Sequence, residues 1–371
     1  MMAKQLNFIF AAGGTGGHLY PAVAVAEQIK LLQPQSNILF VGTKDKIEAR
    51  VIPQLNYKFK SIWISGFSRK LTLKNILFPI KLIVGSIQSF FINLKFKPSV
   101  AIGAGAYVSG PVITTAKLFG AKVVLLEQNS FPGVTNRMLE KKADQIHLSF
   151  EDSKKYFNNK SKLFVTGNPI RTTMKLADKM ESLKHFNLDE TKKTLLVLGG
   201  SLGASSMNFA VEENLDLLKR SNIQVIWQTG DKYFNQYKKL QSEYVKIFPF
   251  ISEMDKAYSA CDLLVARAGA TTIAEAAFLG LPVLFVPSKN VAANHQYLNA
   301  QSLAENKAAL LIEDSELNLR LGSLIIKSIA DEKMLNDLSE NIKKFSKPDA
   351  AKTIAAEIIK MADKNFKSTR N

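Results

Sequence analysis

The sequence predicts an α/β protein of two doubly wound domains, each a parallel β-sheet with helices on both faces, which face one another across a deep cleft. An apolar run, a glycine-rich turn and a helical pattern follow one another at residues 7–29 and again at residues 194–218. Short apolar runs alternate with helix-like stretches through both halves, which is typical of a parallel sheet. The length of 371 residues suits two domains of similar size.

The first half opens with the expected strand 7–12, which is followed by the turn sequence GGTGGH and by a helix. Pro21 stands near the beginning of that helix, where the first turn tolerates proline. Apolar runs that we interpret as further strands of this sheet occupy residues 38–41, 100–102, 122–126 and 145–148.

The second half repeats this order, with the strand 194–198, the glycine-rich turn 199–204 and the helix 205–218. Its remaining strands are expected at residues 224–228, 245–249, 263–266, 282–286 and 309–312. Apolar periodicity weakens between residues 166 and 192, so we place the linker there. The expected boundaries are residues 1–166 for the first domain, 167–348 for the second and 349–371 for a helical tail.

The composition is that of a folded globular protein, because 46% of the residues are apolar and 22% are charged. Cys261 is the single cysteine, so the chain can form no internal disulfide and no cysteine-built metal site. The four histidines lack the spacing of a zinc site, and we expect neither a metal nor another cofactor. The N-terminal apolar stretch is too short for a signal peptide.

The net charge of +17 is concentrated in the first half of the chain. Residues 1–165 contain 22 lysines and arginines against 8 acidic residues, whereas the remaining residues contain 27 against 24. A basic half beside a nearly neutral one suggests an encounter with an anionic partner, either a lipid surface or a nucleic acid. The lysine codons of an AT-rich genome could explain the total charge but not its asymmetry.

Neither glycine-rich turn matches a dinucleotide-binding or Walker A pattern. Leu19 stands where a dinucleotide loop has its third glycine, and no Gly-Lys-Ser/Thr ending occurs. Both turns would still bring backbone N–H groups and a helix N-terminus to an anion, which suits a diphosphate. The alternative is that the glycines only form tight turns between strand and helix and bind no ligand. The occurrence of two such turns at equivalent places in the two halves argues against this alternative.

A third segment leaves a strand at Ala266, turns at Gly269 and enters a helix at Thr271 and Thr272. Glu275 follows about one turn later. Its carboxylate could bond back to the helix start as in a capping box. Alternatively, it could accept both hydroxyls of a ribose, as an acidic residue does in nucleotide-binding α/β folds.

Several motifs follow one another in the order expected of one family. They are GGTGGH at 13–18, GAGAYVSGP at 103–111, EQN at 127–129 with NR at 136–137, GNPIR at 167–171, GGSLGA at 199–204, RAGATTIAE at 267–275 and HQYLNA at 295–300. From about residue 7 to residue 351 the chain resembles the MurG family of peptidoglycan N-acetylglucosaminyltransferases. The sequence departs from the family pattern at two positions, and both departures are small. Ala106 stands where the family usually has glycine, and His295 stands where a second glutamine can occur.

This resemblance implies the GT-B fold and an inverting transfer of N-acetylglucosamine from UDP-N-acetylglucosamine (UDP-GlcNAc) to the C4 hydroxyl of N-acetylmuramic acid in lipid I. The products would be β-1,4-linked lipid II and UDP, in the peptidoglycan synthesis that serves the cell wall, cell shape and cell division. The implied partners are UDP-GlcNAc, lipid I and an anionic membrane surface, with other cell-wall synthesis proteins as further candidates and no nucleic acid. By the same resemblance the tail would return to the first domain.

The second domain would bind the donor without a metal ion. The resemblance implies that the donor-binding residues are Arg171, Ser201, Gly203, Ile251, Ala270, Thr271, Thr272, Ile273, Ala274, Glu275 and Gln296. Among them Glu275 would hold the ribose, the backbone of Ile251 the uracil edge, and Gln296 the sugar or the diphosphate. The 199–204 turn and the helix start after Ala270 would cradle the diphosphate, and Arg171 would reach across the cleft.

The first domain would bind the acceptor. His18 follows the glycine-rich turn, where an imidazole could take the proton of the C4 hydroxyl. A histidine in such a place is about as often a hydrogen-bonded structural group as it is a base, and that alternative stays open. Thr15, Gly16 and Gly17 would line the same pocket, and Asn129 would hold the N-acetyl sugar.

Residues 71–94 have apolar side chains at helical spacing and a polar stripe formed by Lys74, Lys81, Gln88 and Lys95. A proline and charges interrupt the run, so it should not span a bilayer, and we expect peripheral contact with the cytoplasmic face of the plasma (inner) membrane. The expected contact residues are Lys74, Ile76, Leu77, Ile80 and Lys81. A helix packed in the core of the first domain is the alternative.

Two other interpretations compete with this one. Another GT-B enzyme, such as a UDP-GlcNAc 2-epimerase or a glycolipid glycosyltransferase, would share the donor site. An epimerase, however, leaves the motif at 103–111 and the apolar basic segment unexplained. A nucleic-acid-binding protein would need basic residues interleaved with exposed aromatic residues, or a known binding module, and the sequence contains neither.

Overall fold

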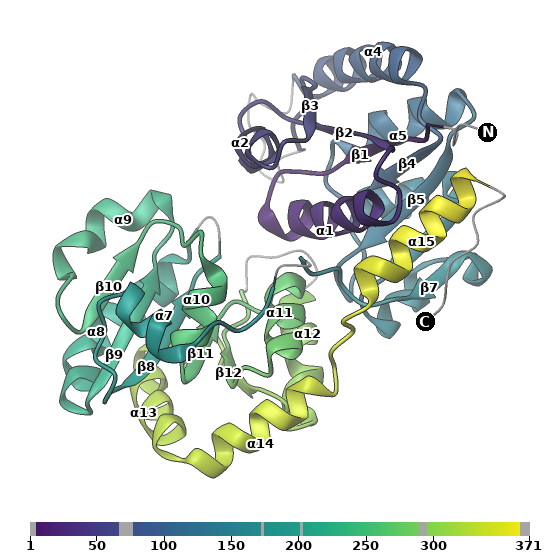
Figure 1. Cartoon of the computed structure of the whole chain (residues 1–371). Coiled ribbons are helices and arrows are strands. Elements are labelled where there is room, and N and C mark those ends of the chain that lie inside the picture. Colours follow the sequence, from purple (N-terminus) through teal and green to yellow (C-terminus); the bar gives the residue numbers. More distant parts are fainter. Residues whose placement is uncertain (1–4, 67–76, 172–173, 201–202, 289–294, 364–371) are drawn as a thin grey trace. The chain divides into compact units, whose positions relative to one another are not determined.

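The computed structural model describes residues 5–66, 77–171, 174–200, 203–288 and 295–363. The chain divides into two compact units, which are unit 1 (Met1–Thr172 with Lys347–Asn371) and unit 2 (Thr173–Ser346). Each unit is built on one parallel β-sheet (Figure 1).

Unit 1 contains a seven-stranded sheet in the order β3-β2-β1-β4-β5-β6-β7, with every neighbouring pair parallel. The strands are β1 (Asn7–Ala11), β2 (Asn37–Gly42), β3 (Lys58–Ser61), β4 (Val100–Gly103), β5 (Lys122–Glu127), β6 (Gln145–Leu148) and β7 (Leu163–Val165). The central strands are buried on both faces, which explains their continuous apolar runs.

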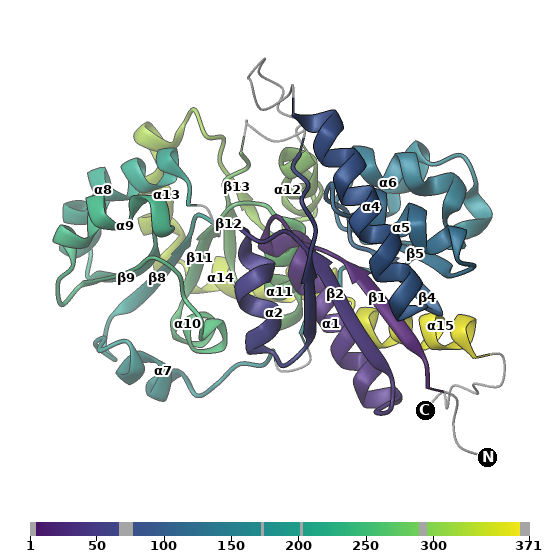
Figure 2. The same ribbon diagram turned by 90° about the horizontal axis from the view of Figure 1, so that it is seen from above.

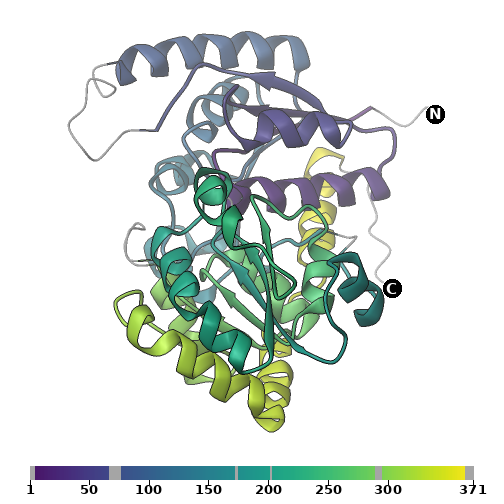
Figure 3. The same cartoon turned by 90° about the vertical axis from the view of Figure 1, so that its left-hand side faces the viewer.

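Helices cover both faces of this sheet. Val25 of α1 and Ile358 of α15 share one core, while Val112 of α5 belongs to the core on the opposite face. Figure 3 shows α1 and α4 on opposite sides of the first strands, and α4 packs against α5 (Figure 2). The helices are α1 (Gly16–Leu32), α2 (Ile47–Gln54), α4 (Phe78–Phe96), α5 (Ser109–Leu118), α6 (Val134–Leu139) and α15 (Ala350–Ala362), with the short 3-10 helices η1 (Glu140–Lys142), η2 (Glu151–Tyr156) and η3 (Lys160–Lys162).

Unit 2 contains a six-stranded parallel sheet in the order β10-β9-β8-β11-β12-β13. Met207 of α8 and Ile325 of α13 pack together with the sheet in one core. The strands are β8 (Lys193–Leu198), β9 (Ile223–Gln228), β10 (Val245–Phe248), β11 (Leu263–Ala266), β12 (Val283–Phe285) and β13 (Leu310–Leu311). The helices are α7 (Lys179–His185), α8 (Ser205–Arg220), α9 (Asp231–Tyr237), α10 (Met254–Ala260), α11 (Ala270–Leu279), α12 (His295–Glu305), α13 (Leu317–Ala330) and α14 (Glu332–Lys343), with the 3-10 helix η4 (Lys238–Leu240).

The polar stretch between residues 166 and 192, where we placed the linker, is more structured than its sequence suggested. Gly167 donates its N–H to the Leu148 carbonyl, so the first residues of the stretch pack with unit 1. Further along, α7 forms a helix of unit 2, and its N-cap Asp178 accepts the Glu181 N–H at 2.9 Å. The spacing Asp-x-x-Glu is a recognisable helix start, and it could have revealed this helix.

Both sheets have a topological switch point, at which consecutive crossovers lead to opposite sides of the first strand. In unit 1 it lies between β1 and β4, and in unit 2 between β8 and β11. The turns that follow these four strands are the glycine-rich segments at 13–17, 103–105, 199–203 and 267–269. Ligands of open α/β sheets bind at such positions, so the topology alone singles out these turns.

Candidate functional site

Glu48 of α2 shapes the glycine-rich turn after β1. Its carboxylate accepts the Gly14 N–H at 2.9 Å, and it accepts both the N–H and the hydroxyl of Thr43 at 2.8 Å. The side chain is only 1% exposed, and a methyl group at Gly13 would overlap it. The turn is therefore fixed by a buried carboxylate that the sequence did not single out.

His18 lies in the first turn of α1, directly after this loop, and is half-buried. Its Nδ1 lies 3.1 Å from Oε1 of Gln128, the residue that follows β5. Thr15 precedes the helix in an extended conformation, and its side chain makes no capping hydrogen bond. The first N–H groups of α1, which begins at Gly16 and Gly17, can therefore face an anion.

Glu127 organises the loop between β5 and α6. Its carboxylate accepts the Asn129 N–H at 2.9 Å, the Gly133 N–H at 2.9 Å and the Asn136 side-chain amide at 2.8 Å. Burial raises the pKa of the Glu127 carboxyl, while these N–H bonds and the nearby charge of His18 act in the opposite direction. Asn129 is thus fixed by Glu127 in the loop that follows β5.

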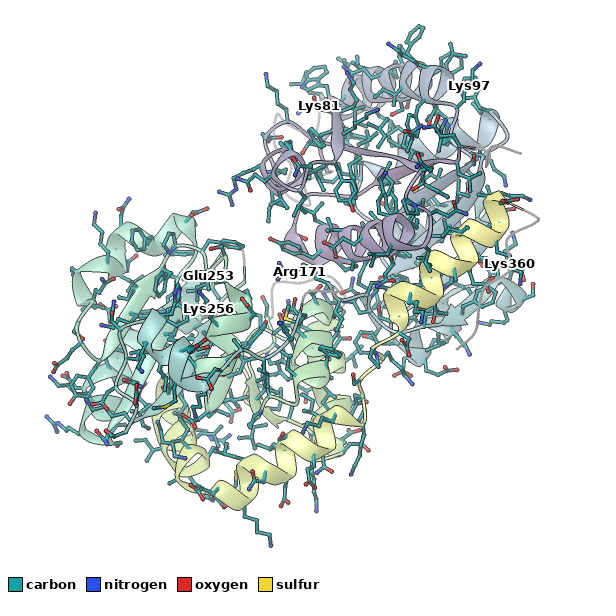
Figure 4. All side chains as sticks on the ribbon, viewed as in Figure 1. Lys81, Lys97, Arg171, Glu253, Lys256 and Lys360 are labelled. Carbon is teal, nitrogen blue, oxygen red and sulfur yellow. The ribbon has the colours of Figure 1, made fainter. Side chains whose placement is uncertain are left out.

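Arg171 follows β7 and belongs to unit 1. The guanidinium of Arg171, which is labelled in Figure 4, lies 5.1 Å from the centroid of the Tyr20 ring, which is the geometry of a cation–π contact. The buried Nε of Arg171 has no hydrogen-bond partner among the described residues.

The turn after β8 in unit 2 depends on glycine conformation. Gly200 and Gly203 have φ angles of +82° and +73°, in the left-handed region that glycine favours. Gln228 joins this turn to a second loop, because its Nε2 donates to the Gly200 carbonyl at 3.3 Å and its Oε1 accepts the Ile251 N–H at 2.9 Å. The Ile251 N–H is thus already used by Gln228. Ser201 lies outside the described residues.

Glu275 lies in the second turn of α11, which begins after the N-cap Gly269. A capping box needs its acidic residue in the first turn, so that alternative does not fit. The buried Glu275 carboxylate instead accepts the hydroxyl of Tyr258 at 2.7 Å. The first turns of the helix are formed by the other predicted residues of this segment, which are Ala270, Thr271, Thr272, Ile273 and Ala274.

Arg267, which follows β11, connects α8 to the segments that follow β12 and β13. Its guanidinium pairs with Asp314 at 2.6 Å and donates to the Ser206 hydroxyl of α8 at 2.8 Å and to the Val286 carbonyl at 3.0 Å. Gln296 of α12 accepts the Ser288 N–H at 2.9 Å. These contacts fix the framework around the β8–β11 switch point.

Two family models match the chain, the glycosyltransferase family 28 N-terminal domain at residues 8–148 and the glycosyltransferase family 28 C-terminal domain at residues 194–354. The crystal structure of Acinetobacter baumannii MurG superposes with a TM-score of 0.71 at 26% identity, over 96% of this chain and 99% of that one. A Flavobacterium psychrophilum protein named UDP-N-acetylglucosamine–N-acetylmuramyl-(pentapeptide) pyrophosphoryl-undecaprenol N-acetylglucosamine transferase is 43% identical over 363 residues, 97% of this chain and 99% of that protein. A protein of the same name from Christiangramia forsetii is 43% identical over 362 residues, again 97% and 99%.

The chain belongs to the MurG family. The prediction of two parallel-sheet, Rossmann-like α/β domains of the GT-B class is thereby confirmed. A putative UDP-N-acetylglucosamine 2-epimerase from Listeria monocytogenes also superposes with a TM-score of 0.71, but at 13% identity, so it shares the fold alone. Sequence similarity, rather than fold, therefore separates the MurG family from the epimerase alternative.

The predicted site residues of this MurG family member fall into two groups. Thr15, Gly16, Gly17 and His18 lie at the β1–β4 switch point of unit 1, and Asn129 lies in the loop after β5. The others described in unit 2 lie around the β8–β11 switch point; they are Gly203, Ile251, Ala270, Thr271, Thr272, Ile273, Ala274, Glu275 and Gln296. Among the described residues, no group of three or more His, Cys, Asp or Glu side chains is arranged to hold a metal ion.

Ala106 departs from the usual glycine of the MurG family at a position where glycine fits better, because its φ angle is +57°. We expect Ala106→Gly to stabilise unit 1 by about 0.5 to 1 kcal/mol, since relief of left-handed strain exceeds the entropy that glycine adds to the unfolded chain. Thermal unfolding would detect the change. Ala116→Gly, inside the helix α5, should instead destabilise the protein, and a loss of stability in Ala106→Gly would contradict the strain argument.

The segment expected at the membrane contains α4, in which many apolar side chains are exposed, while Ile92 and Phe96 pack against the core of unit 1. Ile80, Ile87, Phe91 and Leu94 are between 44% and 61% exposed, so the alternative of a core-packed helix is wrong for them. The buried positions of α4 are instead small or polar, namely Gly85, Ser89 and Asn93.

Lys81 of α4, labelled in Figure 4, is partly exposed; its Nζ donates to the Ser65 hydroxyl at 3.3 Å and lies 5.6 Å from the ring centroid of the exposed Trp63. Leu77 is exposed just before α4, whereas Lys74 and Ile76 lie outside the described residues. None of the helices in the described part of the chain is long and apolar enough to cross a bilayer.

Proposed function

We propose that the protein is an inverting glycosyltransferase that moves N-acetylglucosamine from UDP-GlcNAc to the C4 hydroxyl of the N-acetylmuramic acid of lipid I, forming β-1,4-linked lipid II and UDP. The observation that carries this proposal is 43% identity, over nearly the whole of both chains, to transferases named for this donor sugar and acceptor. The glycine-rich turns at both switch points support it, because each offers backbone donors to a diphosphate.

Unit 2 would bind the donor. The N-terminal ends of α8 and α11 present N–H groups and helix dipoles to the diphosphate, which would stabilise the leaving UDP as negative charge develops on it. Glu275 would accept the ribose hydroxyls, the Ile251 carbonyl would meet the uracil edge, and Gln296 would contact the sugar or diphosphate. Arg171 would add a positive charge from unit 1.

Unit 1 would bind the acceptor. His18 would take the proton of the C4 hydroxyl, while the N–H groups of Gly16 and Gly17 would face the acceptor's anionic groups. Asn129, held by Glu127, would bind the N-acetyl group of the sugar.

We expect Glu275→Gln to weaken the binding of UDP by roughly 10- to 100-fold, because a hydrogen bond to a charged carboxylate contributes about 1.5 to 3 kcal/mol. Tyr258→Phe should weaken it less, since it removes only the hydroxyl that orients Glu275. Calorimetry with UDP and with 2′,3′-dideoxy-UDP would test this. The losses should vanish with the dideoxy ligand, and equal losses with both ligands would remove Glu275 from the ribose site.

The outward face of α4 would bind the cytoplasmic face of the plasma membrane, where exposed apolar side chains enter the headgroup region and lysines meet anionic lipids. We expect reversal of charge at Lys74 and Lys81 to reduce binding to anionic vesicles at least about tenfold, since each basic residue near the surface contributes about 1 kcal/mol. Turnover of a short-chain soluble acceptor should be unchanged. The matched control reverses Lys239 and Lys333, two exposed lysines of unit 2, and unchanged vesicle binding in the α4 variant would count against this face.

The reaction is tested by incubating the purified protein with UDP-GlcNAc and a lipid I analogue in EDTA, with UDP release and glycolipid product both followed. Formation of the disaccharide lipid in EDTA would support a transferase that needs no metal ion. Epimerised sugar nucleotide without transfer would instead favour the epimerase alternative.

A further inference from the structure

Gln128 is a buried side chain that contacts the candidate base. It directly follows β5, is 2% exposed, and its Oε1 lies 3.1 Å from Nδ1 of His18. A buried amide in contact with a half-buried imidazole has few alternative positions, so the contact defines the orientation of the ring.

The strand alternation explains why Gln128, rather than its acidic neighbour, reaches His18. Val124 and Leu126 belong to the core shared with α1, whereas Val123 and Leu125 belong to the core shared with α5. Successive side chains of a strand point to opposite faces, so Gln128 continues the face of α1. Glu127 faces the other way and is held by the loop that leads to α6.

Gly105 provides the space for the imidazole on another side. Its φ angle is +83°, and a methyl group at this position would lie 3.0 Å from both Nδ1 and Cε1 of His18. The ring is thus packed between the backbone of the turn after β4 and the amide of Gln128.

We propose that Gln128 is a positioning residue, whose carbonyl oxygen holds His18 in the tautomer that carries hydrogen on Nδ1 and thereby leaves Nε2 as the atom that takes the acceptor proton. This inference rests on the proposed role of His18. In the step, the C4 O–H bond breaks and its proton moves to Nε2. The oxygen forms a bond to the anomeric carbon of the donor sugar, and UDP leaves with the electrons of the broken C–O bond.

An amide suits this position better than a carboxylate would. A carboxylate in contact with Nδ1 would stabilise the imidazolium, so that a smaller share of His18 would be neutral and able to accept a proton at neutral pH. The charged groups near His18 are Glu127 on the opposite face of β5, Glu48 behind Gly14, and Arg171 against Tyr20. None of them is altered in the variants below.

Nitrogen NMR of ¹⁵N-histidine-labelled protein would observe the tautomer without any assay of turnover. The chain has only four histidines, so a His18→Asn sample identifies the His18 signals. Above the titration range we expect hydrogen on Nδ1 in the unaltered protein and a mixture of tautomers in Gln128→Met. Hydrogen on Nε2 in the unaltered protein would overturn the proposal even if no Gln128 variant folds.

The pH profile of turnover provides the second test. Gln128→Glu should shift the acidic limb of kcat upward by about one to three pH units, so that activity lost at neutral pH returns at higher pH. Gln128→Met should lower kcat about 10- to 100-fold with the KM for UDP-GlcNAc nearly unchanged. An acidic limb that stays in place in a folded Gln128→Glu would overturn the proposal.

Gln145 offers a matched control, because its Oε1 lies 3.2 Å from Nε2 of His147, a histidine outside the proposed reaction. Burial lowers the pKa of His147 to about 4, so this group stays neutral across the profile. Gln145→Glu and Gln145→Met should alter the NMR signals of His147 and leave the acidic limb of the pH profile of kcat unchanged. Full activity of His18→Ala would refute the base itself, while the NMR result on the tautomer would remain.

Discussion

His18→Ala is expected to lower kcat by about 100- to 10,000-fold and to leave the affinity for UDP nearly unchanged. The imidazole would take the proton of the attacking hydroxyl, and a positioned general base contributes an acceleration of this size. His18 lies in unit 1, whereas the donor-binding residues other than Arg171 lie in unit 2, so the donor affinity should be independent of it. Steady-state kinetics with a lipid I analogue, together with calorimetry of UDP binding, would measure both quantities.

A suitable control for this variant is His185→Ala, which changes a histidine of α7 that pairs with Glu253 at 2.9 Å. It removes the same functional group at a partly exposed position of unit 2 and should leave kcat within about twofold. If His18→Ala retains most of its kcat while the protein is folded, then His18 is the hydrogen-bonded structural group of the alternative interpretation.

Gly203→Ala is expected to destabilise unit 2 by about 2 to 5 kcal/mol and to abolish measurable UDP binding. The φ angle of +73° is unfavourable for alanine, and the added methyl group would overlap the Thr229 carbonyl and approach the Tyr233 ring to 2.8 Å. The carbonyl belongs to the backbone and cannot turn away, so the turn after β8 must move. Thermal unfolding and UDP calorimetry would show the two effects together.

Gly200→Ala separates backbone strain from steric overlap. Gly200 has a similar φ angle of +82°, but an added methyl group would meet no described atom within 4 Å. The variant should therefore lose only about 1 to 2 kcal/mol, the cost of left-handed conformation in alanine. Equal losses in Gly200→Ala and Gly203→Ala would mean that the overlap with Thr229 is relieved at no cost.

The sequence predicted the central strands and both glycine-rich turns, because buried parallel strands form continuous apolar runs. It missed β3 and β7, which lie at the two edges of the first sheet. The sequence of β3, Lys-Phe-Lys-Ser, is mostly exposed, and β7 has only three residues. Edge strands bury fewer side chains, so their apolar signal is weak.

The orientation of α4 could not be derived from its periodicity. A helical pattern of apolar residues normally marks the face that packs inward. Here Asn93 bonds to the Thr115 hydroxyl at 2.7 Å and Gln88 accepts the Trp63 N–H at 2.6 Å, so polar side chains join α4 to its neighbours. Only the packing of distant segments reveals which face is covered.

The candidate site was predicted where a motif is local and missed where a contact is distant in sequence. His18 and Glu275 stand within short glycine-containing motifs. Their supporting residues Gln128 and Tyr258 lie 110 and 17 positions away, and Glu48 lies 34 positions from the Gly14 that it binds. Such pairs leave no trace in the local spacing of a single sequence.

The return of α15 to unit 1 has a consequence for biosynthesis. Ile354 and Ile358 complete the same core as Phe8 and Val23, although they leave the ribosome after the whole of unit 2. During synthesis, the core of unit 1 therefore stays incomplete, and the apolar surface that α15 later covers stays exposed. Unit 2 is contiguous in sequence and can fold as soon as it emerges. Protection by a chaperone would matter most in this interval, because the core of unit 1 is completed only after α15 has been synthesised.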